Sequence, residues 1–229
     1  MPEIPASNVS AVRVLLYGDV NLNVMDGSAI WLPSLAETFA LTGAQVHVQL
    51  KAPETRDLLS GPLRRLRGVT VHEARVRHGE DGMSHTRAAE ALEALDAELD
   101  FDVVLVRGSE MCLELVERGR LKGKLWSYIT EYGYIGGGFP DALIRRVSRV
   151  AEGSRLMLAQ TEHARAVLEA LVPAAAGRTE ILSPMVPDDL RPGIRSRWIA
   201  HFSTAVEGLV PIVLFFSTGG WVTAAEHVN

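Results

Sequence analysis

The stretch Phe-Asp-Val-Val-Leu-Val at residues 101–106 decides the fold, because it is apolar almost throughout. A run without a polar face is typical of a central parallel strand that is buried on both sides. The stretch before it, residues 84–99, has the period of a helix, and its apolar face consists of Ala88, Ala91, Leu92, Leu95 and Leu99. A helix that leads into a buried strand is part of a βα repeat, and that repeat predicts an α/β fold.

The same alternation continues in both directions along the chain. Before residue 84, aliphatic runs predict strands at 12–17, 46–50 and 69–73, with helices around 32–43 and 54–66. After residue 106, strands are predicted at 125–130, 155–160 and 179–182, with helices that follow Ser109, Pro140 and Thr161. This total of about seven strands and six helices predicts one doubly wound, mostly parallel, Rossmann-like sheet over residues 11–183.

The first predicted helix has one clear end and one open end. Gly43 follows its apolar stripe and is expected to close it in a left-handed conformation, which glycine adopts without steric cost. Pro33 fits best in the first turn, since farther along its ring clashes with the preceding turn. The sequence therefore places the first residue of this helix only to within a few positions.

The two ends of the chain differ from this repeat. Residues 1–10 are expected to be a flexible N-terminus. Three prolines occur within residues 184–194, which predicts a linker after the sheet domain. Residues 195–229 contain one helical pattern, one apolar run and a glycine loop at 217–221. We interpret them as the incomplete start of a second domain or a remnant tail, because one strand and one helix cannot bury a core.

Composition restricts the class of protein. The 229 residues are 47% apolar and 22% charged, the balance of an ordinary globular chain. The net charge of −5 argues against a nucleic-acid partner, and the single cysteine excludes a disulfide framework and a thiolate metal site. The first residues lack a signal-peptide pattern, and the longest apolar run, 209–216, is far below the ~20 residues that span a bilayer. We therefore expect a cytoplasmic protein and leave contact with a membrane surface open.

The candidate site residues follow the predicted strands. In an open parallel sheet, ligands bind at the carboxyl ends of the strands, near the point where the strand order reverses. We therefore predict substrate-binding side chains in the loops after four strands: Asp19, Asn21, Asn23, Asp26, Gly27, Ser28, Arg107, Ser109, Glu110, Tyr132, Thr161 and Glu162. Glu110 and Glu131 follow adjacent strands, where each could act as a general base or be a solvated carboxylate.

The first of these loops is the most informative. Asp26-Gly27-Ser28 stands at a predicted helix start, where backbone N–H groups can hold an anion or a sugar hydroxyl. The alternative is that Asp26 and Ser28 only cap the helix. The loop is rich in asparagine and longer than a minimal βα turn, which favours a binding role.

Several chemical motifs are missing. The run Gly-Asp-Val-Asn-Leu-Asn at residues 18–23 lacks the pattern G-x-G-x-x-G, which disfavours a tightly bound dinucleotide. The glycines at 136–138 could approach a phosphate or simply form a turn before Pro140. None of the seven histidines has an i, i+4 partner, so we predict no metal site and expect His72, His78 and His85 at the surface.

The order and spacing of these elements resemble the N-terminal half of a GT-B glycosyltransferase of family 4, also called group 1. The resemblance rests on the loop at 21–28, the helix that ends at Gly43, and Val46-His47-Val48, where these enzymes have G-h-x-V-x-V. It continues through 101–104, 125–131, 156–162 and the exit at 182–187, and it covers residues 11 to 190. No single motif is diagnostic, because the order of the motifs carries the match.

The resemblance implies a function. In such enzymes the N-terminal domain holds the acceptor, so the first loop would line a cleft, with Glu131 and Tyr132 near the reacting sugars and Glu131 as the catalytic candidate. Thr130-Glu131-Tyr132 stands where many relatives carry a histidine. The family implies a nucleotide-sugar donor, a sugar-containing acceptor and no tightly bound cofactor.

The donor site of this family lies in a second domain, of which only residues 211–221 could be a start. We therefore expect little or no transferase activity from the chain alone, because the donor and the acceptor must be held together for transfer. A second domain or a partner chain could supply the missing half, and an exposed inter-domain face would favour a homo-oligomer. Two alternatives stay open: a non-catalytic sugar-binding or regulatory module, and an unrelated Rossmann enzyme with a nucleotide cofactor. The missing glycine pattern weighs against the second.

Overall fold

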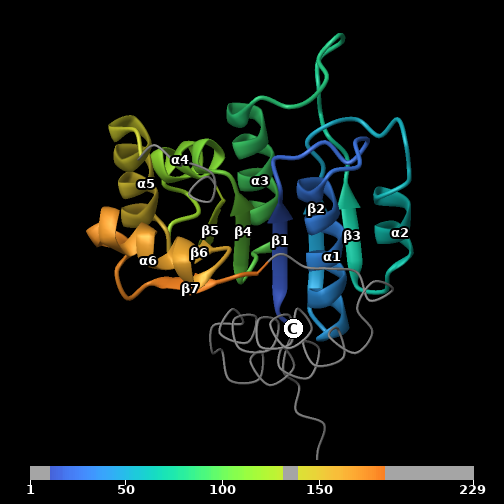
Figure 1. Ribbon diagram of the computed structural model, residues 1–229. Coiled ribbons are helices and arrows are strands. Elements are labelled where there is room, and N and C mark those ends of the chain that lie inside the picture. Colours follow the sequence, from blue (N-terminus) through green and yellow to red (C-terminus); the bar gives the residue numbers. More distant parts are fainter. Residues whose placement is uncertain (1–10, 131–138, 184–229) are drawn as a thin grey trace, which may run out of the picture.

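The structure is a computed structural model that describes residues 11–130 and 139–183 (Figure 1). These residues form a seven-stranded, wholly parallel sheet in the order β3-β2-β1-β4-β5-β6-β7. The strands are β1 (Arg13–Tyr17), β2 (Gln45–Gln49), β3 (Val69–His72), β4 (Val103–Arg107), β5 (Leu125–Ile129), β6 (Leu156–Ala159) and β7 (Thr179–Ile181). The prediction of an α/β, doubly wound, Rossmann-like fold is confirmed.

Six α-helices connect these strands, as the sequence predicts for this part of the chain. They are α1 (Gly27–Leu41), α2 (Ser60–Arg65), α3 (His85–Leu99), α4 (Ser109–Arg118), α5 (Asp141–Gly153) and α6 (Glu162–Leu171). The 3₁₀ turn η2 (Pro173–Ala175) follows α6. The proposed linker at 184–194, the tail at 195–229 and the N-terminus at 1–10 lie outside the described residues.

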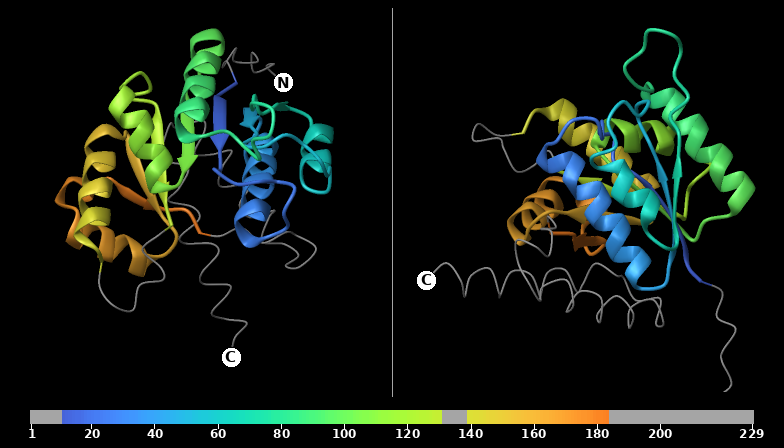
Figure 2. Two further views of the ribbon diagram at one scale, coloured as in Figure 1. Left: turned by 90° about the horizontal axis from the view of Figure 1, so that it is seen from above. Right: turned by 90° about the vertical axis from the view of Figure 1, so that its right-hand side faces the viewer.

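The helices divide between the two faces of the sheet (Figure 2). Side chains of α1 and α2 pack on one face, against alternate residues of β1 and β2 such as Val14, Leu16 and Val48. Side chains of α3, α4, α5 and α6 pack on the other face, against Leu15 and Val104. The central strands β1 and β4 are therefore buried on both sides, as the apolar run at 101–106 predicts.

The ends of the helices follow from local chemistry. Asp26, Ser84 and Thr161 each accept a hydrogen bond from the backbone N–H three residues later, and so cap α1, α3 and α6. The expected left-handed conformation of Gly43 is confirmed by its φ of +89°. Pro33, however, lies inside α1 and not in its first turn, because Asp26 begins the helix earlier than the apolar stripe suggests.

Helices α4 and α5 approach each other closely at Gly153, the last residue of α5. A Cβ atom at this position would lie 2.3 Å from Cγ1 and 2.7 Å from Cγ2 of Val116, a residue of α4. Such distances are well below van der Waals contact, and the branched valine side chain has few rotamers with which to move away. Only glycine therefore allows these two helices to pack as they do.

We expect Gly153→Ala to lower the free energy of unfolding by about 1–3 kcal/mol, through overpacking against Val116. Gly27→Ala is the matched control, because a Cβ there meets no atom within 4 Å and alanine reduces the entropy of the unfolded chain. Urea unfolding of both variants measures the difference. Equal stability of the two variants would contradict the close packing of α4 on α5.

Candidate functional site

The strand order reverses at β1, which pairs with β2 on one side and β4 on the other. The loops after β1 and β4 therefore leave the sheet in opposite directions and open a crevice between them, the usual ligand position in such sheets. Residues 18–26 follow β1, and Gly108 with the start of α4 follows β4. The side chains at these two strand ends form the candidate site.

Asp19 is the most connected side chain of the candidate site. Its carboxylate lies 2.9 Å from Lys51 Nζ and 3.2 Å from His85 Nε2, and it accepts a hydrogen bond of 3.3 Å from the Tyr17 hydroxyl. Asp19 has a φ of +49°, and Asp100 is the only other non-glycine residue with a positive φ among those described. Non-glycine residues adopt this conformation at a cost, and such cost concentrates at functional sites.

Burial and the neighbouring Asp19 carboxylate together raise the pKa of Tyr17 far above its usual range. Tyr17 is fully buried at the end of β1, so its hydroxyl stays neutral and acts as a fixed donor to Asp19. The neutral Tyr17 hydroxyl and two basic side chains, Lys51 and His85, thus orient the Asp19 carboxylate. Its own side chain is 21% exposed, so a ligand can reach it.

Arg107 stands at the end of β4, across the crevice from Asp19. Its Nη2 donates a hydrogen bond of 2.8 Å to Ser28 Oγ, and its guanidinium lies 5.9 Å from the centre of the Trp31 ring. Trp31 in turn stacks on Tyr128 of β5 at 5.1 Å between ring centres. Among the described residues, no carboxylate lies within 4.0 Å of this guanidinium. Arg107 is therefore a pre-oriented cation with unused donors.

The two asparagines of the first loop have structural partners. Asn23 Oδ1 accepts from the backbone N–H groups of Thr55 and Arg56, and its Nδ2 donates to Pro53 O and Asn21 Oδ1. Asn21 Oδ1 also accepts from the Asn23 N–H. These bonds join the loop after β1 to the loop after β2. A direct role of Asn21 and Asn23 in substrate binding stays a prediction.

Other predicted residues have local partners at the same edge of the sheet. Asp26 caps α1 next to Gly27, and Thr161 caps α6. One side-chain oxygen of each residue accepts a hydrogen bond from a backbone N–H of the helix that it caps. Glu162 forms an ion pair with Arg165, and Glu110 forms one of 2.9 Å with Arg146. Ser109 is buried beside Arg146 Nη1, at 3.4 Å. These hydrogen bonds and ion pairs do not involve Asp19 or Arg107.

Glu131 and Tyr132, together with the glycines at 136–138, lie outside the described residues. The predicted catalytic role of Glu131 therefore stays a prediction. Among the described residues, no three side chains of His, Cys, Asp or Glu are grouped so that they could hold a metal ion.

Three residues of the candidate site were not predicted from the sequence: Lys51, His85 and Trp31. Lys51 follows β2 and forms an ion pair with Asp19. His85 is the first residue of α3; it was expected to be an ordinary surface residue, but its side chain contacts Asp19. The expectation also misses that His72 is half-buried. The position of Lys51 at the carboxyl end of a predicted strand is the one sequence feature that points to a place in the site. Its ion pair with Asp19 can be recognised only once the strand order is known.

A histidine pair lies on the sheet face beneath α3. His47 Nδ1 of β2 lies 2.8 Å from His72 Nε2 of β3, the two rings stack, and the edge of Phe101 packs against His47. Burial lowers the pKa of both histidines, and the proximity of His72 lowers the pKa of His47 further. Glu98 acts in the opposite direction on His72, and Arg13 lowers the pKa of His47.

Comparison with solved structures finds similar folds at low sequence identity. UDP-N-acetylglucosamine 2-epimerase from Rickettsia bellii is 16% identical, with a TM-score of 0.50, over 81% of this chain and 50% of that one. MurG from Acinetobacter baumannii is 14% identical, with a TM-score of 0.46, over 77% and 46% of the two chains. An NADH-dependent reductase, A1-R′ complexed with NAD, is 16% identical with a TM-score of 0.40, over 77% and 98%.

The epimerase shows the fold: the described residues form a Rossmann-like α/β domain. This chain spans about half the length of the epimerase. Residues 172–228 match a family described as "Transmembrane protein of unknown function (DUF3556)". No curated protein matches the sequence. None of the helices in the described part of the chain is long and apolar enough to cross a membrane.

The histidine pair predicts a pH dependence of stability. Because the pKa of both groups is lower in the folded state, the unfolded chain takes up protons first as the pH falls through about 6.5, and stability decreases there. We expect the free energy of unfolding to fall less between pH 7.5 and 5.5 in His47→Gln/His72→Asn than in the natural chain. His78→Gln, an exposed histidine, is the control and should leave the slope unchanged. Identical slopes in all three proteins would contradict the prediction.

Proposed function

We propose that this chain is the acceptor-binding half of a glycosyltransferase-like protein of the GT-B type, related to family 4. In the complete enzyme, a sugar would pass from a nucleotide-sugar donor to a sugar-containing acceptor held at the ends of β1 and β4. The observation that carries the proposal is Arg107, which Ser28 and Trp31 orient at the crevice without a carboxylate partner among the described residues.

The chemistry of the two strand ends suits a hydroxylated ligand. Arg107 offers donors on one side of the crevice, and the partly exposed Asp19 carboxylate offers acceptors on the other. Sugar hydroxyls both donate and accept, so they can use the two groups together. Asn23, which also bonds to Asn21, ties the loop that carries Asp19 to the loop after β2.

The donor side of the proposed enzyme is not provided by the described residues. The length match to about half of the epimerase supports a division in which a second domain or a partner chain completes the cleft. We expect Glu131 and Tyr132 to face that second half, with Glu131 as the catalytic candidate. The same proposal includes four further expectations. The protein holds no cofactor tightly, is located in the cytoplasm, contacts a membrane surface and forms a homo-oligomer.

A non-catalytic sugar-binding module is the second candidate. The observation that favours it is that one carboxylate after each of β1, β4 and β6 is already engaged in ion pairs. Asp19 pairs with Lys51 and His85, Glu110 with Arg146, and Glu162 with Arg165. A general base needs a free lone pair directed at the substrate, whereas these carboxylates are directed at neighbouring cationic side chains. Under this candidate the cleft binds a sugar and carries out no transfer.

Thermal-shift titration of the purified chain tests the proposal. We expect stabilisation by acceptor-type mono- and disaccharides, and none by UDP-N-acetylglucosamine, GDP-mannose, NAD or S-adenosylmethionine. The shift follows RT ln(1 + [L]/Kd), so a ligand at about ten times its Kd adds roughly 1.4 kcal/mol. Stabilisation by NAD or S-adenosylmethionine alone would replace the proposal by an unrelated Rossmann enzyme.

We expect Arg107→Ala to weaken binding of the sugar that stabilises the chain by about tenfold or more. The loss of one hydrogen bond from a charged donor is worth roughly 1.5–3 kcal/mol. Arg65→Ala, an exposed arginine of α2, is the matched control and should bind normally. Isothermal titration calorimetry on both variants measures the effect. Equal affinity of the two variants would show that the sugar binds elsewhere.

A further inference from the structure

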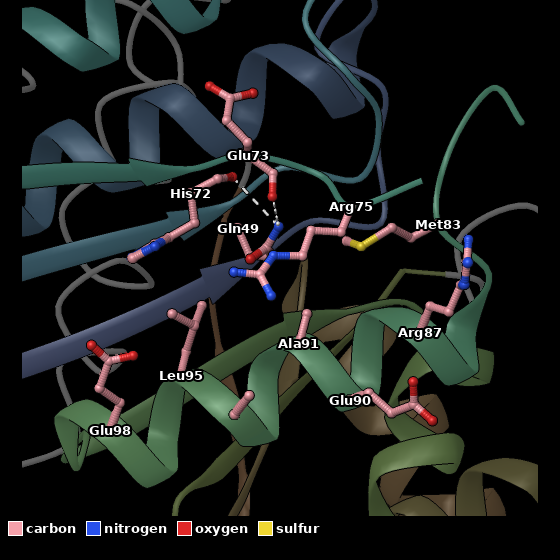
Figure 3. A pocket seen from close by; sticks show the side chains of 11 residues that line it. Gln49, His72, Glu73, Arg75, Met83, Arg87, Glu90, Ala91, Leu95 and Glu98 are labelled. Atoms are coloured by element: carbon pink, nitrogen blue, oxygen red, sulfur yellow. Dashed lines mark hydrogen bonds between the residues drawn. The ribbon is translucent and has the colours of Figure 1, made fainter. Parts of the chain in front are cut away.

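A polar groove lies on the sheet face beside α3 (Figure 3). Its volume is about 530 Å³, within the usual range for small-molecule sites. Gln49 of β2 and His72 of β3 form the floor, and Arg75 extends over it from the chain after β3. Helix α3 forms the opposite wall. The groove exists because α3 covers β1 and β4, which leaves this face of β2 and β3 without a covering helix among the described residues.

The charged groups of the groove are only partly paired. Glu73 forms an ion pair with Arg64, and Arg87 forms one with Glu80. Arg75 makes no hydrogen bond or ion pair with another described residue, and Glu90 and Glu98 have no cation within 4.0 Å among them. The unpaired groups therefore carry both signs, with the guanidinium of Arg75 above the floor and the two carboxylates on α3.

This mixture of charges selects against simple ions. A phosphate or carboxylate would meet Arg75 but also Glu90 and Glu98, and a cation would meet Arg75. A neutral ligand with many hydroxyl groups can accept from the guanidinium and donate to the carboxylates in the same pose. The short apolar strip of Ala91, Ala94 and Leu95 on α3 offers a surface for the C–H face of a sugar ring.

The groove begins where the candidate site ends. Met83 and Arg87 line the groove, while His85 between them pairs with Asp19. The backbone N–H of Met83 donates a hydrogen bond of 2.7 Å to the carbonyl oxygen of Lys51, whose side chain forms an ion pair with Asp19. One segment, residues 83–87, thus separates the Asp19 end of the crevice from the groove. The crevice and the groove therefore meet at this one chain segment.

We propose that this groove binds the distal sugars of a neutral oligosaccharide whose end lies at Asp19 and Arg107. The inference rests on the proposed acceptor function and names its substrate class: a chain of at least three neutral sugar units. Arg75 and Glu98 contact the distal units by hydrogen bonds. A single sugar binds only at the strand ends and does not use the groove.

A glycan array of neutral, sialylated and phosphorylated mono- to hexasaccharides, probed with the labelled natural chain, tests the inference. Each glycan that binds is then measured by calorimetry with Arg75→Ala, Glu98→Gln and Arg107→Ala. Arg67→Ala is the matched control, because Arg67 is exposed and has no partner among the described residues. Circular dichroism and unfolding midpoints confirm that each variant is folded.

We expect neutral tri- to hexasaccharides to bind at least tenfold more tightly than monosaccharides. Arg75→Ala and Glu98→Gln should each remove most of that gain and leave monosaccharide binding unchanged. Loss of binding to monosaccharides and oligosaccharides alike in Arg107→Ala supports the proposed function beneath the inference. Tight binding of a single sugar with no gain from chain length overturns the groove inference and leaves the acceptor function standing. Preference for phosphorylated or sialylated glycans also overturns it, and absence of any bound glycan overturns both.

Discussion

Right-handed crossovers between parallel strands are the constraint on which the rest of the structure depends. From β1 the chain first winds toward β2 and β3, which places α1 and α2 on one face of the sheet. It then returns to β4 and winds the other way, which places α3 to α6 on the opposite face. The crevice at β1 and β4 is a consequence of this reversal. So is the polar groove, since no described helix lies on that face of β2 and β3.

Asp19 converts this topology into a site with fixed geometry. Its left-handed backbone turns the chain at the end of β1, and its carboxylate then meets Lys51 after β2 and His85 at the start of α3. Three segments that are distant in sequence are held together through one carboxylate. Arg107 on the other side is oriented by Ser28 and by the Trp31 ring. The site is therefore largely formed before a ligand arrives, which reduces the entropy lost on binding.

The sequence predicts the elements of this fold better than it predicts the site. The apolar run that becomes β4 is a local signal and is confirmed, and Asp26 has the capping role that was the alternative to ligand binding. Pro33 misleads, because the Asp26 cap starts α1 well before the proline. His85 cannot be assigned from sequence, since its partner Asp19 is 66 positions away and meets it only in the folded sheet. Asn23 shows the reverse. It lies in an asparagine-rich loop whose composition suggests ligand binding, while its side-chain amide joins two loops.

We expect ligands to bind at the carboxyl ends of β1 and β4. The most direct measurement is an amide ¹H–¹⁵N NMR map of the chain during titration with an acceptor disaccharide. We expect the perturbed signals to cluster at residues 18–28, 51, 85 and 107–110. The signals of residues 119–124, which precede β5 at the amino edge of the sheet, should not change. Perturbations confined to the amino edge, or spread without a cluster at Asp19 and Arg107, would contradict this expectation.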